Sequence, residues 1–433
     1  MESLDKIKSI VKECRYYEDL YDIIWKINAN KTIQKSDYKD IRIGLFNTPC
    51  GGFGDIIVCK TFYDYLKEWY PGSRVSICTT APQKYKDLGI DGNIYKLTSK
   101  GSEEECIDYD KLSLKKKINF DIMIIIPIIN KTFEINTFKK LIPYANIFNT
   151  FTVSEYNGEY PPYTFPIGVG EGNLGLLMNN FKYKQQTLIK KPYALVYIQP
   201  SPNWGVHSKS CFLSYIEMIC KLYHKKHSKF QVVIPQWIDE EVFENGNFRR
   251  NIIKIIKNYY DSIYFIDEGG GRGQEPIYDK KNSKSKITFR ADILPQKREI
   301  FISLMKDSIR DILVTGDQSL TDIVSCCRGS KRVWYQIAPW KKGLAYNLSE
   351  HIPNKYYSTF KTSCGTLKSI DSKIDWKNIM KNYDFRENGR KRMNSIILGV
   401  NKLQEDKLFI EILRIIERSR YLETAQNKIF KLK

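Results

Sequence analysis

The sequence predicts an α/β protein of two domains, each built on a largely parallel sheet, and three observations lead to this fold class. The chain has 433 residues, more than one hydrophobic core normally organises. In its first half, short apolar runs alternate with amphipathic helical stretches, as in a parallel sheet covered by helices. The alternation restarts at Tyr193, after a polar stretch at 179–191. We therefore expect domains at 1–185 and 186–370, and helices at 371–433 that pack across both.

The expected elements follow the apolar periodicity of each half. In the first half we expect two helices within 1–38, helices at 55–69 and 134–143, and strands at 41–47, 75–80, 93–97, 121–127 and 147–153. In the second half we expect strands at 193–200, 230–235, 262–267, 311–315 and 331–337. Helices are expected at 211–226, after Pro235 to about Tyr260, at 295–308 and from 374 onward, with a glycine- and lysine-rich connector at 268–285.

The net charge is +20, with 69 Lys and Arg against 49 Asp and Glu. This balance indicates an anionic partner, which would be nucleotide phosphates, nucleic acid or an anionic membrane face. The alternative is compositional, because an AT-rich genome also favours Lys, Ile, Asn and Tyr. The lysines are spread along the chain and no known nucleic-acid-binding motif occurs, so nucleic acid is the less favoured partner.

The ten cysteines have neither disulfide-framework nor zinc-ligand spacing, and only four histidines accompany them. We therefore expect reduced, mostly buried thiols and no bound metal. No apolar run is long enough to span a membrane, and the N-terminus does not resemble a signal peptide. A cytoplasmic location is expected. Peripheral membrane contact stays open, because the basic and apolar C-terminal helix could lie on a membrane or a partner instead of across the domains.

The most informative motif is a glycine turn, GGFGD, between an expected strand and an expected helix. Gly51, Gly52 and Gly54 remove side chains where the backbone turns tightly or lets a ligand approach. The N-terminus of the following helix offers free N–H groups and a positive dipole end to a phosphate or carboxylate. Asp55 begins that helix, either as its N-cap residue or as a general base.

A second polar cluster follows the first strand of the second half. Ser201, Asn203 and Lys209 come at the carboxyl end of this strand, where open α/β sheets bind ligands. Lys209 would neutralise a diphosphate at that place, unless it is a solvated loop lysine.

The third motif is VTGDQSLTDIVSCC, a strand that turns at Gly316 into a helix. Backbone N–H groups and polar side chains at this helix start would hold a diphosphate, and the side chains are those of Asp317, Gln318, Ser319 and Thr321. The alternative is a structural helix capped by Asp317 or Ser319.

A fourth segment, RVWYQIAPWKKG, carries three aromatic residues. Trp334, Tyr335 and Trp340 are candidates to stack on a base or a sugar, or else they are core residues of a strand.

Together these motifs resemble GT-B glycosyltransferases. GGFGDIIVC followed by YPGSRVSI is similar to the opening of bacterial heptosyltransferases and of protein-arginine rhamnosyltransferases. QPSPNW with the SK that follows is similar to a heptosyltransferase stretch whose phosphate-binding lysine falls on Lys209. TGDQSLTDIVSCCRGSKRVWYQIAPW resembles the G-(D/E)-x-S segment of the rhamnosyltransferases, with Asp317 as its acid. No histidine stands near Gly316, as one does in heptosyltransferases, so donor and acceptor do not carry over.

The resemblance implies two Rossmann-like domains that face each other across a cleft, the first on the acceptor side and the second on the nucleotide-sugar donor side. It implies that a sugar moves from a nucleotide-sugar to a glycan, lipid or protein acceptor, with inversion and with neither a metal nor another cofactor. Asp55 would then be the base. The glycine turn and the polar residues of the second and third motifs would bind the donor, and Asp317 would contact sugar hydroxyls or an acceptor cation.

Two other functions remain open on the sequence. One is a non-catalytic nucleotide- or RNA-binding protein that uses the same cleft and the basic surface. The other is a different group transferase on the same double fold, such as a pyruvyl- or polysialyl-type enzyme.

Overall fold

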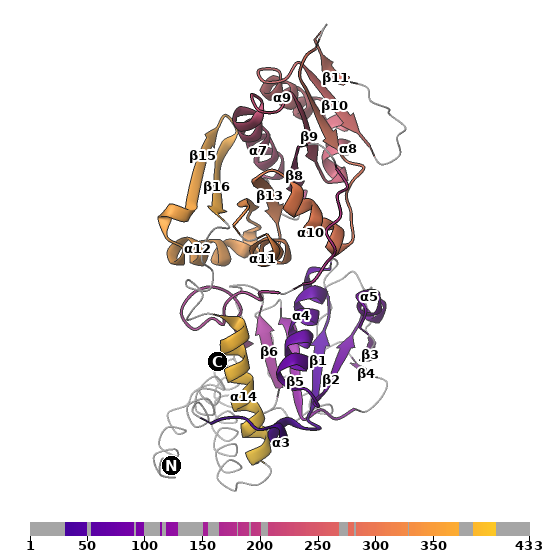
Figure 1. The fold of residues 1–433 in the computed structure, drawn as a ribbon. Helices are drawn as coiled ribbons and strands as arrows, with labels where there is room; N and C mark the ends of the chain where they lie inside the picture. The colour runs from indigo at the N-terminus through magenta and orange to yellow at the C-terminus, as the bar shows by residue number, and fades with distance from the viewer. Residues whose placement is uncertain are drawn as a thin grey trace, which may run out of the picture. The chain divides into compact units, whose positions relative to one another are not determined.

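The computed structural model divides the chain into two compact units (Figure 1). Unit 1 comprises Met1–Leu177 and Asn382–Lys433, and unit 2 comprises Met178–Lys381. The division falls eight residues before the expected boundary at 185, and the C-terminal helix groups with unit 1. The structure describes residues 31–49, 53–90, 92–98, 113–114, 118–128, 150–154, 164–179, 181–189, 192–200, 207–267, 276–280, 283–327, 329–371 and 384–403.

Unit 1 is built on a seven-stranded sheet in the order β4-β3-β2-β1-β5-β6-β7. All neighbouring strands are parallel except β3 and β4. Both central strands, β1 after its first residue and β5 before its last, are continuously buried and mostly apolar, as expected when helices cover both faces of a sheet. The strands are β1 (Arg42–Asn47), β2 (Arg74–Thr79), β3 (Asn93–Thr98), β4 (Ser113–Leu114), β5 (Ile122–Ile128), β6 (Thr150–Ser154) and β7 (Thr164–Phe165).

In the described part of unit 1, helices from its two chain segments pack against each other. They are α3 (Lys35–Tyr38), α4 (Gly54–Trp69), α5 (Pro82–Asp87) and α14 (Phe385–Leu403), and α14 runs beside α4 in Figure 1. Phe385 of α14 packs on two rings of α4, with centroids 5.6 Å from Phe62 and 5.9 Å from Tyr65. The hydroxyl of Tyr70 donates to Asn394 Oδ1 at 2.8 Å. These contacts explain why the C-terminal helix belongs to unit 1.

Unit 2 is built on a nine-stranded sheet in the order β11-β10-β12-β9-β8-β13-β14-β16-β15. The six strands from β10 to β14 are parallel, whereas β11 and the β15–β16 hairpin are antiparallel additions at the two ends. The strands are β8 (Tyr193–Tyr197), β9 (Lys229–Val233), β10 (Ser262–Ile266), β11 (Pro276–Asp279), β12 (Lys286–Arg290), β13 (Asp311–Thr315), β14 (Arg332–Gln336), β15 (Tyr357–Thr362) and β16 (Gly365–Asp371).

The helices of unit 2 connect these strands. They are α7 (Ser208–Tyr223), α8 (Gln236–Glu244), α9 (Gly246–Ile256), α10 (Arg298–Asp307), α11 (Asp317–Cys326) and α12 (Lys342–His351), with short turns η3 (Pro339–Lys341) and η4 (Asn354–Tyr356). The single helix expected after Pro235 is wrong, because the chain breaks between α8 and α9 at Asn245. The Oδ1 of Asn245 accepts the backbone N–H of Phe248 at 3.1 Å, so this residue caps α9.

The connector expected at 268–285 is partly wrong. Its described part includes β11, which pairs antiparallel with β10, and it leads directly into β12. The sequence analysis did not predict β12, which lies between β10 and β9 in the sheet. Two of its five residues are apolar, and its buried residues are Ile287, Thr288 and Phe289.

The thiols of the described chain are reduced, as expected: Cys59, Cys78, Cys211, Cys220, Cys326, Cys327 and Cys364 are all free. Within the described ranges, His, Cys, Asp and Glu side chains form no group of three that could hold a metal ion. No helix in that part of the chain combines the length and the apolar character needed to cross a bilayer.

Candidate functional site

Each sheet contains a point at which the strand order reverses, and such points are where open α/β sheets bind ligands outside the carboxyl ends of the strands. In unit 2 the point lies between β8 and β13, because successive strands run outward from β8 through β9 and from β13 through β14. In unit 1 it lies between β1 and β5. The helices that follow these strands begin at the same edge, so their unsatisfied N–H groups gather there.

In unit 2 a buried glutamine ties this edge together. The side chain of Gln336, at the end of β14, accepts from the backbone N–H of Gln199 at 3.0 Å and donates to the carbonyl of Gln199 at 3.1 Å. Its amide also donates to Ser208 Oγ, at the first residue of α7, at 2.9 Å. The start of α7 is therefore fixed to the carboxyl ends of β8 and β14.

Helix α11 begins directly at the end of β13. Gly316, the one residue between them, has a φ of 85°, a conformation that side chains with a Cβ rarely adopt. This glycine caps the helix without any side-chain hydrogen bond, so the first N–H groups of α11 lack a capping side chain. The sequence prediction of a tight turn at Gly316 is confirmed, and neither Asp317 nor Ser319 is the N-cap.

A nearly buried ion pair stands at this helix start. Lys341 Nζ lies 2.5 Å from Asp317 Oδ2, and their side chains are 5% and 13% exposed. The hydroxyl of Tyr335 donates to the other carboxylate oxygen of Asp317 at 3.4 Å. A lysine held in this way places a positive charge beside the N-terminus of α11, whose dipole end is also positive. The combination favours an anion, and Asp317 supplies the compensating charge in the protein itself.

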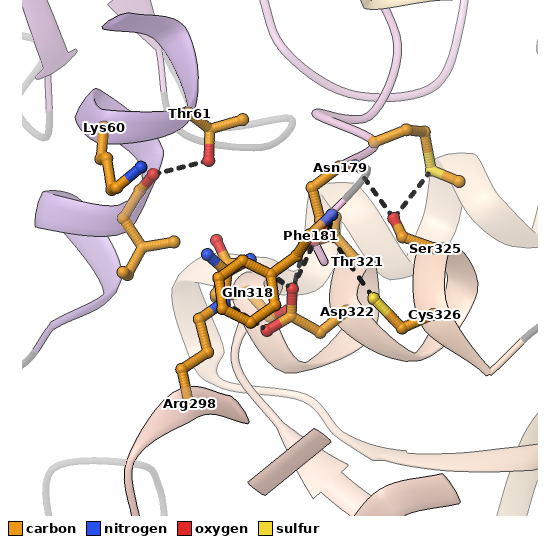
Figure 2. Close-up of polar contacts among 12 residues, drawn as sticks. Lys60, Thr61, Asn179, Phe181, Arg298, Gln318, Thr321, Asp322, Ser325 and Cys326 are labelled. Carbon is orange, nitrogen blue, oxygen red and sulfur yellow. Dashed lines mark hydrogen bonds and ion pairs between the residues drawn. The ribbon is translucent and has the colours of Figure 1, made fainter. Parts of the chain in front are cut away.

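A second buried carboxylate, Asp322, lies one turn further along α11 (Figure 2). It accepts from Arg298 Nη2 of α10, from Asn179 Nδ2 and from Gln318 Nε2, each at 2.7 Å and each on Oδ1. Arg298 Nε also donates to Oδ2 at 3.2 Å. We call these four residues the Asp322 hub. Because the amide of Gln318 belongs to the hub, it is committed to a contact inside unit 2.

The other two predicted residues of this helix start, Ser319 and Thr321, are buried inside unit 2. The hydroxyl of Thr321 donates to the carbonyl of Gln318 at 3.0 Å. Phe181 lies over the guanidinium of Arg298 at 4.6 Å from the ring centroid, which shields one side of the hub from solvent.

Lys209 is the second residue of α7, close to the network around Gln336. Its Nζ lies 2.7 Å from Glu241 Oε2 of α8, and both side chains are about one-third exposed. It also lies over the ring of Phe248, 5.7 Å from the centroid. Ion pairs this open to water contribute only about 0–1 kcal/mol, so an incoming phosphate can compete with Glu241 for this lysine.

The three aromatic candidates behave differently. Trp334 is only 1% exposed and its Nε1 donates to the buried Asp311 at 2.8 Å, so the stacking role expected for it is wrong. It is a core residue on the part of β14 remote from the carboxyl edge. Tyr335 is half-buried and points its hydroxyl to Asp317. The side chain of Trp340 lies outside the described part of the structure.

In unit 1 the carboxyl ends of β1 and β5 are joined by a buried asparagine. Asn47 Nδ2 donates to the carbonyl of Ile126 at 2.8 Å, and its Oδ1 accepts from the hydroxyl of Tyr85 at 2.7 Å. The same amide lies 3.5 Å from the carbonyl of Asp55. Asn47 therefore links the strand ends to the first turn of α4.

Helix α4 begins at Gly54 with Phe53 as its N-cap residue, which makes no side-chain capping bond. Asp55 is thus the second residue of the helix, half-buried, and the N-cap alternative for it is wrong. A Cβ added to Gly54 would meet nothing within 4 Å, so packing within the protein does not require this glycine. The predicted residues Gly51, Gly52, Ser201 and Asn203 lie outside the described residues.

Most residues that fix these helix starts were not predicted from the sequence. They are Asn47, Arg298, Asp322, Gln336 and Lys341. Lys341 stands in the segment singled out for its aromatic residues, but a lone lysine after a tryptophan carries no signal of its own. Asp322 could have been suspected, since it is a carboxylate on the apolar side of an amphipathic helix.

No protein-family model matches the chain, and no curated protein matches it at a significant level. Among solved structures, that of MurG from Acinetobacter baumannii aligns at 12% identity over 87% of this chain and 99% of that chain, with a TM-score of 0.33. A glycosyltransferase from Rickettsia africae aligns at 12% identity over the same shares, with a TM-score of 0.38. A family 9 glycosyl transferase from Veillonella parvula aligns at 10% identity over 84% and 98%, with a TM-score of 0.33. The fold class rests on the two largely parallel sheets described above.

Proposed function

We propose that the protein is a glycosyltransferase that moves a sugar from a nucleotide-activated donor to an acceptor, with inversion and without a metal ion. The single observation that carries the proposal is the nearly buried Lys341–Asp317 pair at the start of α11, on the edge where the strand order of unit 2 reverses. The motif resemblance supports the same reaction class.

Unit 2 is proposed to bind the donor. A leaving nucleoside diphosphate needs N–H donors and cations that are in place before its charge develops. The start of α11 supplies backbone N–H groups, Lys341 supplies a fixed cation, and Lys209 at the start of α7 supplies a second one. In this proposal the diphosphate competes with Asp317 for Lys341 and with Glu241 for Lys209. When it binds, one ligand replaces two carboxylates of similar total charge as the partner of the two lysines.

Unit 1 is proposed to supply the base. An inverting transfer requires one carboxylate to take the proton from the acceptor hydroxyl or other nucleophile as the new bond forms. Asp55 stands in the first turn of α4 at the reversal point of the unit 1 sheet. The empty space beside Gly54 would let an acceptor approach this helix start closely.

The experiment is a thermal-shift panel of UDP-, GDP-, CMP-, dTDP- and ADP-sugars, since a ligand that binds only the folded state raises the melting temperature. The expected result is a shift with one nucleotide class that is lost in Lys341→Gln and kept in Lys342→Gln. Lys342 is the matched control, being the adjacent and exposed lysine.

A panel in which no nucleotide-sugar shifts the wild-type protein, or in which both lysine variants respond like the wild type, would contradict the donor site. In the second step, the protein is incubated with the nucleotide-sugar that binds and with glycan, lipid or peptide acceptors. The release of free nucleotide is then measured.

A further inference from the structure

The positive charge of the protein is concentrated in unit 2. Residues 178–381 contain 34 Lys and Arg against 19 Asp and Glu, a net charge of +15. The rest of the chain contains 35 against 30, a net charge of +5. Compositional drift acts on the whole gene, so it does not account for this threefold difference between two units of similar size.

The topology gathers part of this charge at one edge. Because β9, β10 and β12 are parallel, the segments that precede them meet at the amino ends of the strands, opposite to the proposed donor site. The register places Lys229 of β9 directly beside Lys286 of β12, which in turn lies beside Ser262 of β10. We call this side of the sheet, with the segments 224–228, 257–261 and 280–285, the amino edge.

Six exposed lysines lie at the amino edge: Lys225, Lys226, Lys229, Lys257, Lys280 and Lys284. The acidic side chains of the same segments are few. Asp261 is engaged by the backbone N–H and hydroxyl of Ser285 and lies 3.6 Å from Lys280, and Asp279 is exposed. The edge therefore keeps a clear excess of positive charge.

Helix ends account for part of this set of lysines, because Lys257 is the C-cap residue of α9 and Lys225 directly follows the C-cap residue of α7. Lys221, Lys254 and Lys306 stand in the last turns of α7, α9 and α10, where a cation stabilises the negative end of the helix. Lys229 starts a strand and Lys284 precedes one, so no helix end accounts for them. A fold that needed only capped helices would not require this second set.

The chemistry of the edge favours a lipid surface over nucleic acid. Nucleic-acid surfaces usually offer aromatic faces to the bases, but here Tyr223, His227 and Phe230 stack on one another, with centroids 5.7–6.2 Å apart. Leu222, in the last turn of α7 shortly before this edge, is an exposed apolar side chain at 39%. Lysines on one edge of a sheet with an exposed leucine match an anionic, planar surface with an apolar interior.

We propose that the amino edge binds the anionic headgroups of a membrane surface and so holds the protein at a bilayer as a peripheral protein. The lysine ammonium groups contact lipid phosphates and carboxylates, and Leu222 enters the apolar boundary. The attraction is electrostatic in the main, so it falls as salt rises. This surface is separate from the residues assigned to sugar transfer.

The experiment is co-sedimentation with vesicles of phosphatidylcholine alone and of phosphatidylcholine mixed with phosphatidylserine. The test variant changes Lys225, Lys226, Lys229 and Lys284 to Gln. The matched control changes Lys297, Lys342, Lys361 and Lys368 to Gln, which removes the same charge from exposed lysines elsewhere in unit 2. Each lysine near an anionic surface contributes about 1 kcal/mol, so the test variant, which lacks four of them, should bind roughly a thousandfold more weakly to the mixed vesicles.

The expected result is salt-sensitive binding of the wild type and the control to mixed vesicles only, with unchanged melting temperatures for both variants. Equal loss in the test and control variants would show that net charge alone acts, and would overturn the assignment to this edge. Failure of the wild type to bind mixed vesicles would also overturn it. The assignment would also be overturned if the wild type binds duplex RNA, the test variant loses this binding, and the two proteins bind vesicles equally well.

Discussion

The two reversal points of the molecule are built in different ways. In unit 1, residues 48–53 separate β1 from α4, and the uncharged side chain of Asn47 joins the strand ends. In unit 2, Gly316 alone separates β13 from α11, and the Asp317–Lys341 pair occupies the helix start. A longer connection around one carboxylate suits a place where substrates vary or move. A one-residue turn beside a fixed cation suits a ligand group of constant charge and size, such as a diphosphate.

The largest effect is expected from Asp55→Asn in unit 1. Removing a general base typically slows proton transfer by about 10²–10⁴-fold, so turnover should nearly vanish while the nucleotide-sugar still raises the melting temperature. The measurement is a transfer assay beside the thermal-shift panel. Asp64→Asn is the control on the same helix, where Asp64 pairs with Lys60 at 2.7 Å. Turnover that survives Asp55→Asn would remove unit 1 from the chemistry.

The next effect concerns stability and lies in unit 2. Lys341→Met leaves Asp317 nearly buried without its cation, so we expect a loss of about 3 kcal/mol in the free energy of unfolding. The double change Lys341→Met with Asp317→Asn removes both charges and should regain most of that loss. Urea unfolding of the three proteins measures it. A single variant as stable as the wild type would mean that the pair is solvated, and that unit 2 has no fixed cation.

The two glycines that begin the helices sharpen the comparison. Gly316 combines a φ of 85° with a ψ of 143°, a conformation that residues with a Cβ rarely adopt, so Gly316→Ala should cost about 1–3 kcal/mol. Gly54 lies in a helix with open space around it, so Gly54→Ala should leave the free energy of unfolding unchanged or raise it by about 0.4–1 kcal/mol. If Gly54→Ala stabilises the fold but slows transfer, the glycine serves the approach of a substrate. If Gly54→Ala changes neither the free energy of unfolding nor the transfer rate, Gly54 does not serve the approach of a substrate.

The effect that is smallest per step, about 1 kcal/mol for each pH unit, is in the pH dependence of stability. Burial lowers the pKa of Lys331 in unit 2 to about 8, from 10.5. Between pH 8 and 10.5 this lysine is protonated in the unfolded chain and neutral in the folded chain. Its contribution to the free energy of unfolding therefore rises with pH over this range, by at most about 3 kcal/mol. Lys331→Met should abolish that rise.

Buried thiols act in the opposite direction in both units. Burial raises the pKa of Cys59 in unit 1 and of Cys211 in unit 2 to about 12, from 9.0. The unfolded thiols lose their protons first, so stability falls as pH rises through 9. The measurement is the free energy of unfolding at several pH values from about 7.5 to 10. It should fall less steeply with pH in the wild type than in Lys331→Met, and the two slopes should differ by about 1 kcal/mol per pH unit. Parallel curves would mean that Lys331 stays charged in the fold.

Much of the parallel framework could be predicted, because buried strands such as β1 and β8 are apolar runs of strand length followed by amphipathic helices. The strand β12 was missed because Lys286 and Arg290 bound it and its middle residues are few. The hairpin of β15 and β16 was missed for a similar reason, since its residues are half-exposed and polar. Half-buried strands are predicted from apolar and polar alternation, and the polar, partly exposed residues of β15 give little of it.

The candidate site could be predicted only where a local rule applies. Gly316 was found because a strand followed by glycine and a polar helix start is a local pattern. Lys341 and Asn47 were not, because their roles depend on partners 24 and 79 residues away in the sequence. The Asp322 hub likewise joins Asn179 to a residue 143 positions later. For Trp334 the sequence left stacking and core roles open, because a tryptophan on a strand gives no indication of which neighbour will meet its ring N–H.

The Asp322 hub has a mechanical consequence. Asn179 is the second residue of unit 2, and its amide, its carbonyl oxygen and its backbone N–H all grip α11, through Asp322, Cys326 and Ser325. The first residues of unit 2 are thus attached to α11, the helix that begins directly after Gly316.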